Sequence, residues 1–281
     1  MNRLKAKKLI ESFLIEDIGV NDFSANTIFE DDKIGEGIFT AKTDGIISGT
    51  DIISLTYEAY GKNVDSEIIK KDKSEVKKGD IIAKVKGSVT ALLTCERVIL
   101  NLMQHMSGIA TATSYAVKLL DDNSIRICDT RKTLPGLRMF EKYAVTCGGG
   151  FNHRFGLFDG VMLKDNHIAF AGGIENAVKK VRSQTGHMIK IEVETENAEQ
   201  VKEAVRAGAD IIMFDNRTPE EIKELVKLVP KHIVTEASGG INLNNISSFK
   251  GTNVNYISMG AVIHSAMPMD ISFNSMEGNK I

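Results

Sequence analysis

A dense group of cationic side chains occupies one stretch of the sequence. Between residues 126 and 164 there are seven basic residues, Arg126, Arg131, Lys132, Arg138, Lys142, Arg154 and Lys164, against three acidic ones, Asp129, Glu141 and Asp159. Guanidinium groups suit planar carboxylates and phosphates, and lysine supplies a compact charge to a phosphate. Because the whole chain has a formal net charge of only -2, we expect no nucleic-acid partner. The local excess predicts a site for a small, strongly anionic ligand.

Glycines surround these cations. Arg131 and Lys132 come directly after an apolar segment ending at Thr130, and Gly148–Gly150 precede His153 and Arg154. Glycine permits backbone conformations that let a loop approach a ligand closely. An isolated Arg-Lys pair would suit a solvated loop equally well, but this combination, with Lys164 at the end of the next apolar segment, favours a binding loop.

Polar and small residues recur at the ends of later apolar segments. Glu194, Asp215, Ser238 and Gly260 are separated by 21, 23 and 22 residues, one strand-helix unit per step. Parallel barrel strands bring their carboxyl ends to one mouth. Glu194 and Asp215 are therefore candidates for holding Mg²⁺ or stabilising a cationic transition state. Either carboxylate would equally cap the next helix, and Glu192, with the same strand parity as Glu194, is a further candidate.

The last two of these segments are each followed by a glycine-containing loop. These loops are Ser238-Gly239-Gly240 and Met259-Gly260-Ala261. In barrels, the backbone amides after the final strands often hold a phosphate. We expect a phosphate cradle here, with plain turns as the alternative.

The second half of the chain alternates strand-like and helical segments. The expected strands are 125–130, 160–164, 188–194, 210–215, 232–237 and 256–259, and the clearest helices are 173–184, 198–207 and 219–229. This alternation predicts a parallel α/β sheet. A doubly wound sheet usually has a glycine-rich turn after its first strand, and none follows residues 125–130, so we favour a barrel.

The first half has a different pattern. A helix is expected over 5–16, short strands over 35–42, 45–48, 64–69 and 80–85, and a long helix from Thr94 to about Leu120. This predicts an α+β domain joined by a helix to the barrel. The Gly79-Asp80 turn resembles those of lipoyl carrier domains, but a turn between strands needs no cofactor to explain it.

Composition excludes several classes of protein. The longest apolar runs are far shorter than the roughly 20 residues of a membrane-spanning helix, and the basic N-terminus lacks the apolar core of a signal peptide. We therefore expect a cytoplasmic protein without a membrane partner. Cys95, Cys128 and Cys147 form no C-x-x-C pair, so buried reduced thiols are expected in place of disulfides or zinc ligands.

The run from Asp129 to Arg154, together with Lys164-Asp165-Asn166-His167-Ile168, resembles the signature of the quinolinate phosphoribosyltransferases. The similarity extends to Glu192-Val193-Glu194, Phe214-Asp215-Asn216 and Ser238-Gly239-Gly240. It implies an N-terminal α/β sandwich domain over 1–108, with the tail 266–281 packing on it. It also implies an incomplete α/β barrel of parallel strands over 109–265, usually in a homodimer.

The resemblance implies an activity and roles for individual residues. The family transfers phosphoribosyl from phosphoribosyl pyrophosphate (PRPP) to the ring nitrogen of quinolinate, with decarboxylation to nicotinate mononucleotide, in NAD biosynthesis. The implied quinolinate and phosphate ligands are Arg131, His153, Arg154 and Lys164, with Thr130 beside them and Lys132 near the reacting centre. Glu194 and Asp215 are assigned to ribose and Mg²⁺-pyrophosphate. Ser238, Gly239, Gly240, Met259, Gly260 and Ala261 are assigned to the 5-phosphate, and Arg97 to the partner subunit's site.

Two departures from the family pattern and several alternatives remain. Asn21-Asp22-Phe23-Ser24 replaces Gly-Asp-Leu-Thr, and His105-Met106 stands where an arginine commonly follows the glutamine. The second departure bears on the subunit contact. The alternatives are a nicotinate phosphoribosyltransferase, a molybdenum-transport-associated accessory or binding protein of the same fold, and a Schiff-base aldolase that uses Lys164. His167 is expected to have a structural hydrogen-bonding role.

Overall fold

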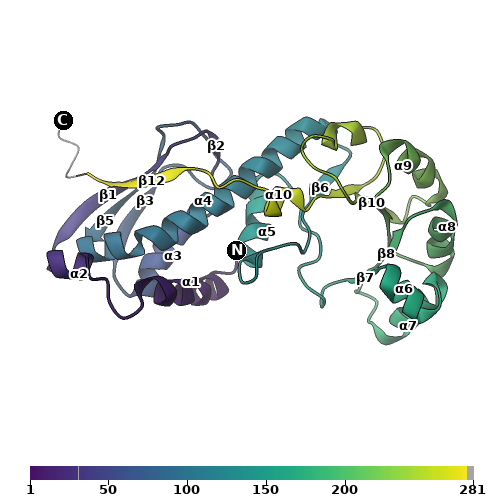
Figure 1. Cartoon of the computed structure of the whole chain (residues 1–281), viewed down its shortest axis with the longest axis horizontal. Helices are drawn as coiled ribbons and strands as arrows, with labels where there is room; N and C mark the ends of the chain where they lie inside the picture. Colours follow the sequence, from purple (N-terminus) through teal and green to yellow (C-terminus); the bar gives the residue numbers. More distant parts are fainter. Residues whose placement is uncertain (31, 277–281) are drawn as a thin grey trace. The chain divides into compact units, whose positions relative to one another are not determined.

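The computed structural model describes residues 1–30 and 32–276 of the chain (Figure 1). The chain divides into two compact units. Within the described residues, the first comprises 1–114, 134–149 and the segment from 266 onward, and the second comprises 115–133 and 150–265. Helix α4 (Val89–Leu120) begins in the first unit and ends in the second.

The first unit contains a four-stranded antiparallel sheet. Its order is β12-β1-β5-β3, made by β1 (Ile34–Ala41), β3 (Val64–Ile68), β5 (Ile81–Ser88) and β12 (Ile271–Ser275). Every second residue of β1 is buried, so one face of this strand packs on the core. On adjacent strands Phe39 pairs with Phe273, and the ring centroids are 4.9 Å apart. The two-residue strands β2 (Gly45–Ile46) and β4 (Glu75–Val76) form a small separate ribbon.

Helices complete this unit. They are α1 (Arg3–Ile18), α2 (Ala25–Ile28), α3 (Asp51–Tyr60), the first part of α4, and α5 (Arg138–Cys147). The Asn2 side chain accepts a hydrogen bond from Lys5 N and so begins α1. Ala6, Ile10 and Leu14, four residues apart, form the buried stripe of α1. The expected N-terminal helix and strands are confirmed, whereas α3 was not predicted.

The second unit is built on a six-stranded parallel sheet. Its order is β6-β11-β10-β9-β8-β7. The strands are β6 (Arg126–Cys128), β7 (Val161–Leu163), β8 (Ile191–Thr195), β9 (Ile211–Asp215), β10 (Val234–Ser238) and β11 (Tyr256–Ser258). The edge strands β6 and β7 do not pair with each other in the described part of the chain. The sheet is therefore an incomplete barrel, as expected, and Phe151 adds a single parallel bridge beside β6.

Helices connect the strands of this unit (Figure 1). They are α6 (Asp165–Ala171), α7 (Ile174–Gln184), α8 (Ala198–Ala207), α9 (Pro219–Leu225) with the short 3₁₀ helix η1 (Val226–Leu228), η2 (Ile246–Phe249) and α10 (Ala261–His264). Thr218 and Glu221 form a reciprocal cap at the start of α9, with Pro219 in its first turn. Asp215 is therefore not needed as a helix cap.

Two expectations from composition can be compared with the structure. Cys95, Cys128 and Cys147 are all buried free thiols, as predicted. None of the helices in the described residues has the length and apolar character needed to cross a lipid bilayer.

Candidate active site

Lys164 and Glu194 meet at the carboxyl ends of neighbouring strands. Lys164 follows β7 and Glu194 is the penultimate residue of β8, and Lys164 Nζ forms an ion pair with Glu194 Oε1. The Glu194 side chain is only 15% exposed. Burial raises the pKa of Glu194, the Lys164 ammonium opposes this, and the charge of Asp215 adds to the increase. Two carboxylates and one lysine thus share this edge of the sheet.

The loops after β9 and β10 are held against each other. The carboxylate of Asp215 accepts a hydrogen bond of 2.7 Å from the side-chain amide of Asn216. The Asn216 backbone amide donates to the Ser238 carbonyl oxygen at 2.9 Å. Asn216 has a positive φ of 52°, and a Cβ on Gly239 would come within 2.3 Å of its Oδ1 atom. Residue 239 must therefore be glycine for the two strand ends to approach this closely.

The loop after β11 contacts the loop after β6. Met259 N donates to the Cys128 carbonyl oxygen at 2.9 Å, and a Cβ on Gly260 would lie 3.2 Å from Lys132 Cδ. Lys132 N in turn donates to Thr130 Oγ1 at 3.0 Å. The structure thus brings the predicted Thr130–Lys132 segment and the predicted phosphate loop together.

Arg131 and Arg154 form a pair of like charges. Burial lowers the pKa of Arg154, and the neighbouring Arg131 guanidinium lowers it further. Arg154 Nη1 donates to the Gly160 carbonyl oxygen at 2.9 Å, whereas the buried Arg131 Nε has no hydrogen-bond partner among the described residues. Two partly buried guanidinium groups that repel each other are costly without an anion. The buried, unpartnered Arg131 Nε is the strongest structural evidence in the described residues for an anionic ligand.

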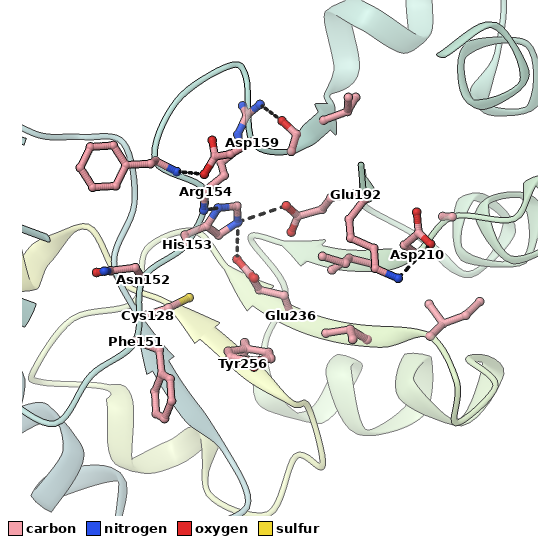
Figure 2. A pocket seen from close by; sticks show the side chains of 18 of the residues that line it. Cys128, Phe151, Asn152, His153, Arg154, Asp159, Glu192, Asp210, Glu236 and Tyr256 are labelled. Atoms are coloured by element: carbon pink, nitrogen blue, oxygen red, sulfur yellow. Dashed lines mark hydrogen bonds and ion pairs between the residues drawn. The ribbon is translucent and has the colours of Figure 1, made fainter. Parts of the chain in front are cut away.

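His153 points into the interior of the incomplete barrel, which contains a cavity of about 770 Å³. Figure 2 shows the imidazole between the carboxylates of Glu192 and Glu236, which come from β8 and β10. His153 Nε2 lies 3.1 Å from Glu192 Oε2 and 3.5 Å from Glu236 Oε1. The Arg154 backbone amide donates to His153 Nδ1 at 2.7 Å.

The protonation of this cluster follows from its contacts. Burial lowers the pKa of His153, but the two carboxylates outweigh burial and raise it to about 10. The Arg154 amide on Nδ1 acts in the opposite direction, because it favours a ring protonated on Nε2 alone. In both the charged and the neutral form of the imidazole, Nε2 carries a proton that faces the carboxylates. Burial also raises the pKa of Glu192.

The cluster of His153, Glu192 and Glu236 has the residue types of a metal site, with one ligand atom from each within 4.8 Å of the others. A metal-bound histidine donates a hydrogen bond from its second ring nitrogen. In His153 the second nitrogen accepts a hydrogen bond from Arg154. The cluster therefore fits a buried group of ion pairs better than a metal centre.

Most of the predicted site residues lie in the second unit, on or after strand ends. Arg97 belongs to the first unit, where it is exposed on α4. His167 accepts a hydrogen bond from Lys164 N at 3.2 Å, which supports the structural role expected for it. In the first unit, His105 Nε2 lies 2.9 Å from the buried carboxylate of Glu141.

Three residues of this region were not predicted as site residues. Glu236 and Asp129 are buried, at 4% and 0% exposure, and Asn216 contacts Asp215. The alternation of side chains along a strand could have identified Glu236. It precedes Ser238 by two positions and therefore points to the same side of β10. A charged residue on the inward side of a barrel strand is unusual enough to indicate a function.

Comparison with known proteins identifies the family. The family model described as "Quinolinate phosphoribosyl transferase, N-terminal domain" matches residues 22–107, and that of the C-terminal domain matches residues 109–274. The chain belongs to the quinolinate phosphoribosyltransferase family. The matched regions include every site residue predicted from the family signature.

Individual members of the quinolinate phosphoribosyltransferase family are similar along nearly the whole chain. The "Probable nicotinate-nucleotide pyrophosphorylase [carboxylating]" of Bacillus subtilis is 52% identical over 280 residues, covering 100% of this chain and 96% of the relative. The chloroplastic enzyme of that name from Arabidopsis thaliana is 40% identical, covering 95% and 81%. The crystal structure of NadC from Streptococcus pyogenes, 38% identical, superposes with a TM-score of 0.93 over 98% of this chain and 99% of that one.

Proposed function

We propose that this protein transfers the phosphoribosyl group of PRPP to the ring nitrogen of quinolinate and removes the 2-carboxylate as CO₂, forming nicotinate mononucleotide and pyrophosphate. The observation that carries the proposal is the buried Arg131 Nε without a hydrogen-bond partner in the described residues, together with the neighbouring guanidinium of Arg154 and carboxylate of Glu194. Paired guanidinium groups suit a dicarboxylate. Carboxylates suit the positive charge that develops on ribose when pyrophosphate departs.

Quinolinate binds through its two carboxylates in this proposal. Arg131 and Arg154 each form a charge-assisted contact with it, and Lys164 shares its charge between Glu194 and the substrate. Arg131 Nε, which lacks a hydrogen-bond partner in the described residues, gains one from the ligand. Nicotinate has no 2-carboxylate and would leave part of this cation group unpaired, so it is the poorer substrate.

PRPP lies across the strand ends. Ser238–Gly240 and Met259–Ala261 surround the 5-phosphate, and backbone amides of these loops other than that of Met259, which donates to Cys128, contact it. The positive φ values of Gly239 and Gly240, 87° and 66°, keep this loop open to a phosphate. Lys132, which packs on Gly260, contributes a cation near the same group and the reacting centre. These contacts fix the C1 carbon of ribose in front of the quinolinate nitrogen.

Glu194 and Asp215 are the residues that would hold Mg²⁺. Oxygen donors on neighbouring strand ends suit this hard cation, which commonly uses one or two carboxylates together with substrate phosphates. When bound, the ion would neutralise charge on the departing pyrophosphate. Omission of Mg²⁺ with added chelator is expected to abolish transfer and leave quinolinate-induced thermal stabilisation intact. Loss of both would assign the metal a structural role.

The bond changes balance without a covalent enzyme intermediate. The pyridine nitrogen lone pair forms the bond to C1 as the C1–oxygen bond breaks, and pyrophosphate leaves with that electron pair. The bond from C2 to its carboxylate then breaks and CO₂ departs, leaving the electron pair on C2, where the adjacent positively charged ring nitrogen stabilises it. A proton replaces the carboxylate at C2. The protein contributes orientation and a preorganised charge distribution.

We further propose a homodimer in which Arg97 completes the partner's site, and a cytoplasmic location in keeping with soluble substrates. Mixing two inactive variants tests the dimer. After unfolding and refolding together, Arg97→Ala and Lys132→Ala are expected to recover roughly a quarter of wild-type activity, because some dimers then contain one intact site. No recovery, with mixed dimers demonstrated, would contradict the shared site. The molybdenum-transport alternative is not supported, since the matched relatives carry the pyrophosphorylase name.

Chromatographic detection of nicotinate mononucleotide tests the proposed function. Purified protein with quinolinate, PRPP and Mg²⁺ is expected to form the nucleotide and pyrophosphate in equal amounts, and omission of either co-substrate is expected to stop both. Product from nicotinate at equal or greater kcat/KM would contradict the assignment of quinolinate.

A further inference from the structure

Both ring nitrogens of His153 are engaged within the protein. Nδ1 accepts the Arg154 amide at 2.7 Å, and Nε2 faces Glu192 and Glu236 at 3.1 and 3.5 Å (Figure 2). The side chain is 12% exposed. Contacts with the protein on both ring nitrogens fix the orientation of the imidazole.

The two carboxylates that hold the ring are themselves buried. Glu192 is 2% exposed and Glu236 is 4% exposed. Neither Glu192 Oε1 nor Glu236 Oε1 has a hydrogen-bond partner among the described residues, so Glu236 acts on the ring through its charge at 3.5 Å from Nε2. Two acidic side chains in a barrel interior reduce stability unless they are compensated. Buried charges that reduce stability are expected at positions where function requires them.

The network continues from His153 to Arg154. His153 N donates to the buried carboxylate of Asp129 at 2.9 Å, so the residue is held through its backbone and its ring. The ring then fixes the Arg154 amide, and the Gly160 carbonyl oxygen fixes the Arg154 guanidinium. The direction of Arg154 therefore depends on acidic groups that lie two residues before Glu194 on β8 and two residues before Ser238 on β10.

We propose that Glu192 and Glu236 are positioning residues that act through His153 to orient Arg154 for quinolinate. In this proposal His153 transmits the position of the two carboxylates to the backbone of Arg154. The inference rests on the proposed function, because it assigns Arg154 to the quinolinate end of the site. It extends that function by assigning a role to the buried carboxylates of Glu192 on β8 and Glu236 on β10.

Steady-state kinetics of isosteric variants test the inference. Glu192→Gln and Glu236→Gln keep side-chain volume and remove the charge that holds the imidazole. Each is expected to raise KM for quinolinate about tenfold, in the range of one lost charge-assisted hydrogen bond, with KM for PRPP changed less than about twofold. The matched control is Glu203→Gln on α8, whose carboxylate accepts the Ile174 and Glu175 amides away from the site. It is expected to alter thermal stability and neither KM value.

A double-mutant cycle separates positioning through His153 from an independent effect. In a His153→Ala background, adding Glu236→Gln is expected to change KM for quinolinate less than about twofold, because residues in one network are not additive. Additive effects, equal changes in both KM values, or a Glu203→Gln effect of the same kind would overturn the inference. If Glu192→Gln does not fold, the kinetics of Glu236→Gln and the double-mutant cycle still test the inference. Complete inactivity of the wild type would instead contradict the proposed function.

Discussion

Gly239 lies so close to Asn216 that a Cβ at residue 239 would come within 2.7 Å of the Asn216 backbone nitrogen. This contact joins the ends of β9 and β10, where the proposed phosphate loop begins beside Asp215. Backbone cannot move aside as easily as a flexible side chain. The geometry of the PRPP site therefore depends on the absence of a side chain at this position.

Gly239→Ala is expected to destabilise the protein by about 2–4 kcal/mol, from left-handed backbone strain and overpacking, and to raise KM for PRPP. Gly251→Ala is the matched control: its φ is also positive, 72°, but no atom lies within 4 Å of its Cβ position. The control should cost about 1 kcal/mol and leave KM unchanged. Thermal unfolding and initial rates measure both effects. Equal losses of stability in the two variants would show that the Asn216 contact is unimportant.

The Arg131–Arg154 pair predicts a trade-off between stability and binding. Arg131→Met removes one of two repelling guanidinium groups, so the ligand-free protein is expected to keep or slightly increase its Tm. The wild type should gain Tm with quinolinate, because a ligand that binds only the folded state stabilises it. The variant should lose that gain. A variant with lower intrinsic Tm and an undiminished quinolinate shift would contradict the anion-site assignment.

Glu194 gives a prediction for pH. Because burial raises its native pKa above the unfolded value, its contribution to stability is fully present below the unfolded pKa and is lost as pH rises through the native pKa. Glu194→Gln should therefore be the more stable protein at pH 7, by roughly 1–3 °C in Tm, and lose this advantage below about pH 4. It should also be less active. Tm measured against pH for both proteins tests the sign, and an advantage confined to acid would contradict it.

The cysteines should be unreactive in the native protein. Cys95, Cys128 and Cys147 are buried free thiols, and burial raises the pKa of Cys95 to about 12. Since the thiolate is the reactive form, iodoacetamide at pH 8 should label none of the three in the native state and all three in guanidinium chloride. Mass spectrometry counts the labels. Rapid native labelling of Cys128 would show that the barrel cavity opens to solvent more than its burial indicates.

The sequence predicted the elements and the strand ends of this fold well. Residues 198–207 were expected to be helical, and α8 has these bounds. The alternation of strands and helices could be predicted from the spacing of apolar residues, because each strand and helix buries its apolar residues in the same core. Helix α3 was not predicted, because Ile52 and Ile53 occur together with Leu55, Thr56 and Tyr57 among its buried residues, which obscures a simple amphipathic stripe.

The candidate site was predicted as a set of residue types, and its internal geometry was not. The spacing of Glu194 and Asp215 placed them at one edge of the sheet. Spacing does not reveal that Lys164 pairs with Glu194, or that the His153 ring turns toward Glu192 and Glu236. Those directions depend on how inward side chains from nonadjacent strands share the barrel interior. Such contacts join residues far apart in sequence and leave no local pattern.

The most direct test of the account uses quinolinate labelled with ¹⁴C in one carboxylate at a time, with PRPP and Mg²⁺. The account predicts that label from the 2-carboxylate appears as CO₂ in step with nicotinate mononucleotide, that label from the 3-carboxylate stays in the nucleotide, and that Arg154→Ala and Lys132→Ala reduce both products together by about 100-fold or more. Nucleotide formation with the 2-carboxylate label retained, or CO₂ release without PRPP, would contradict it.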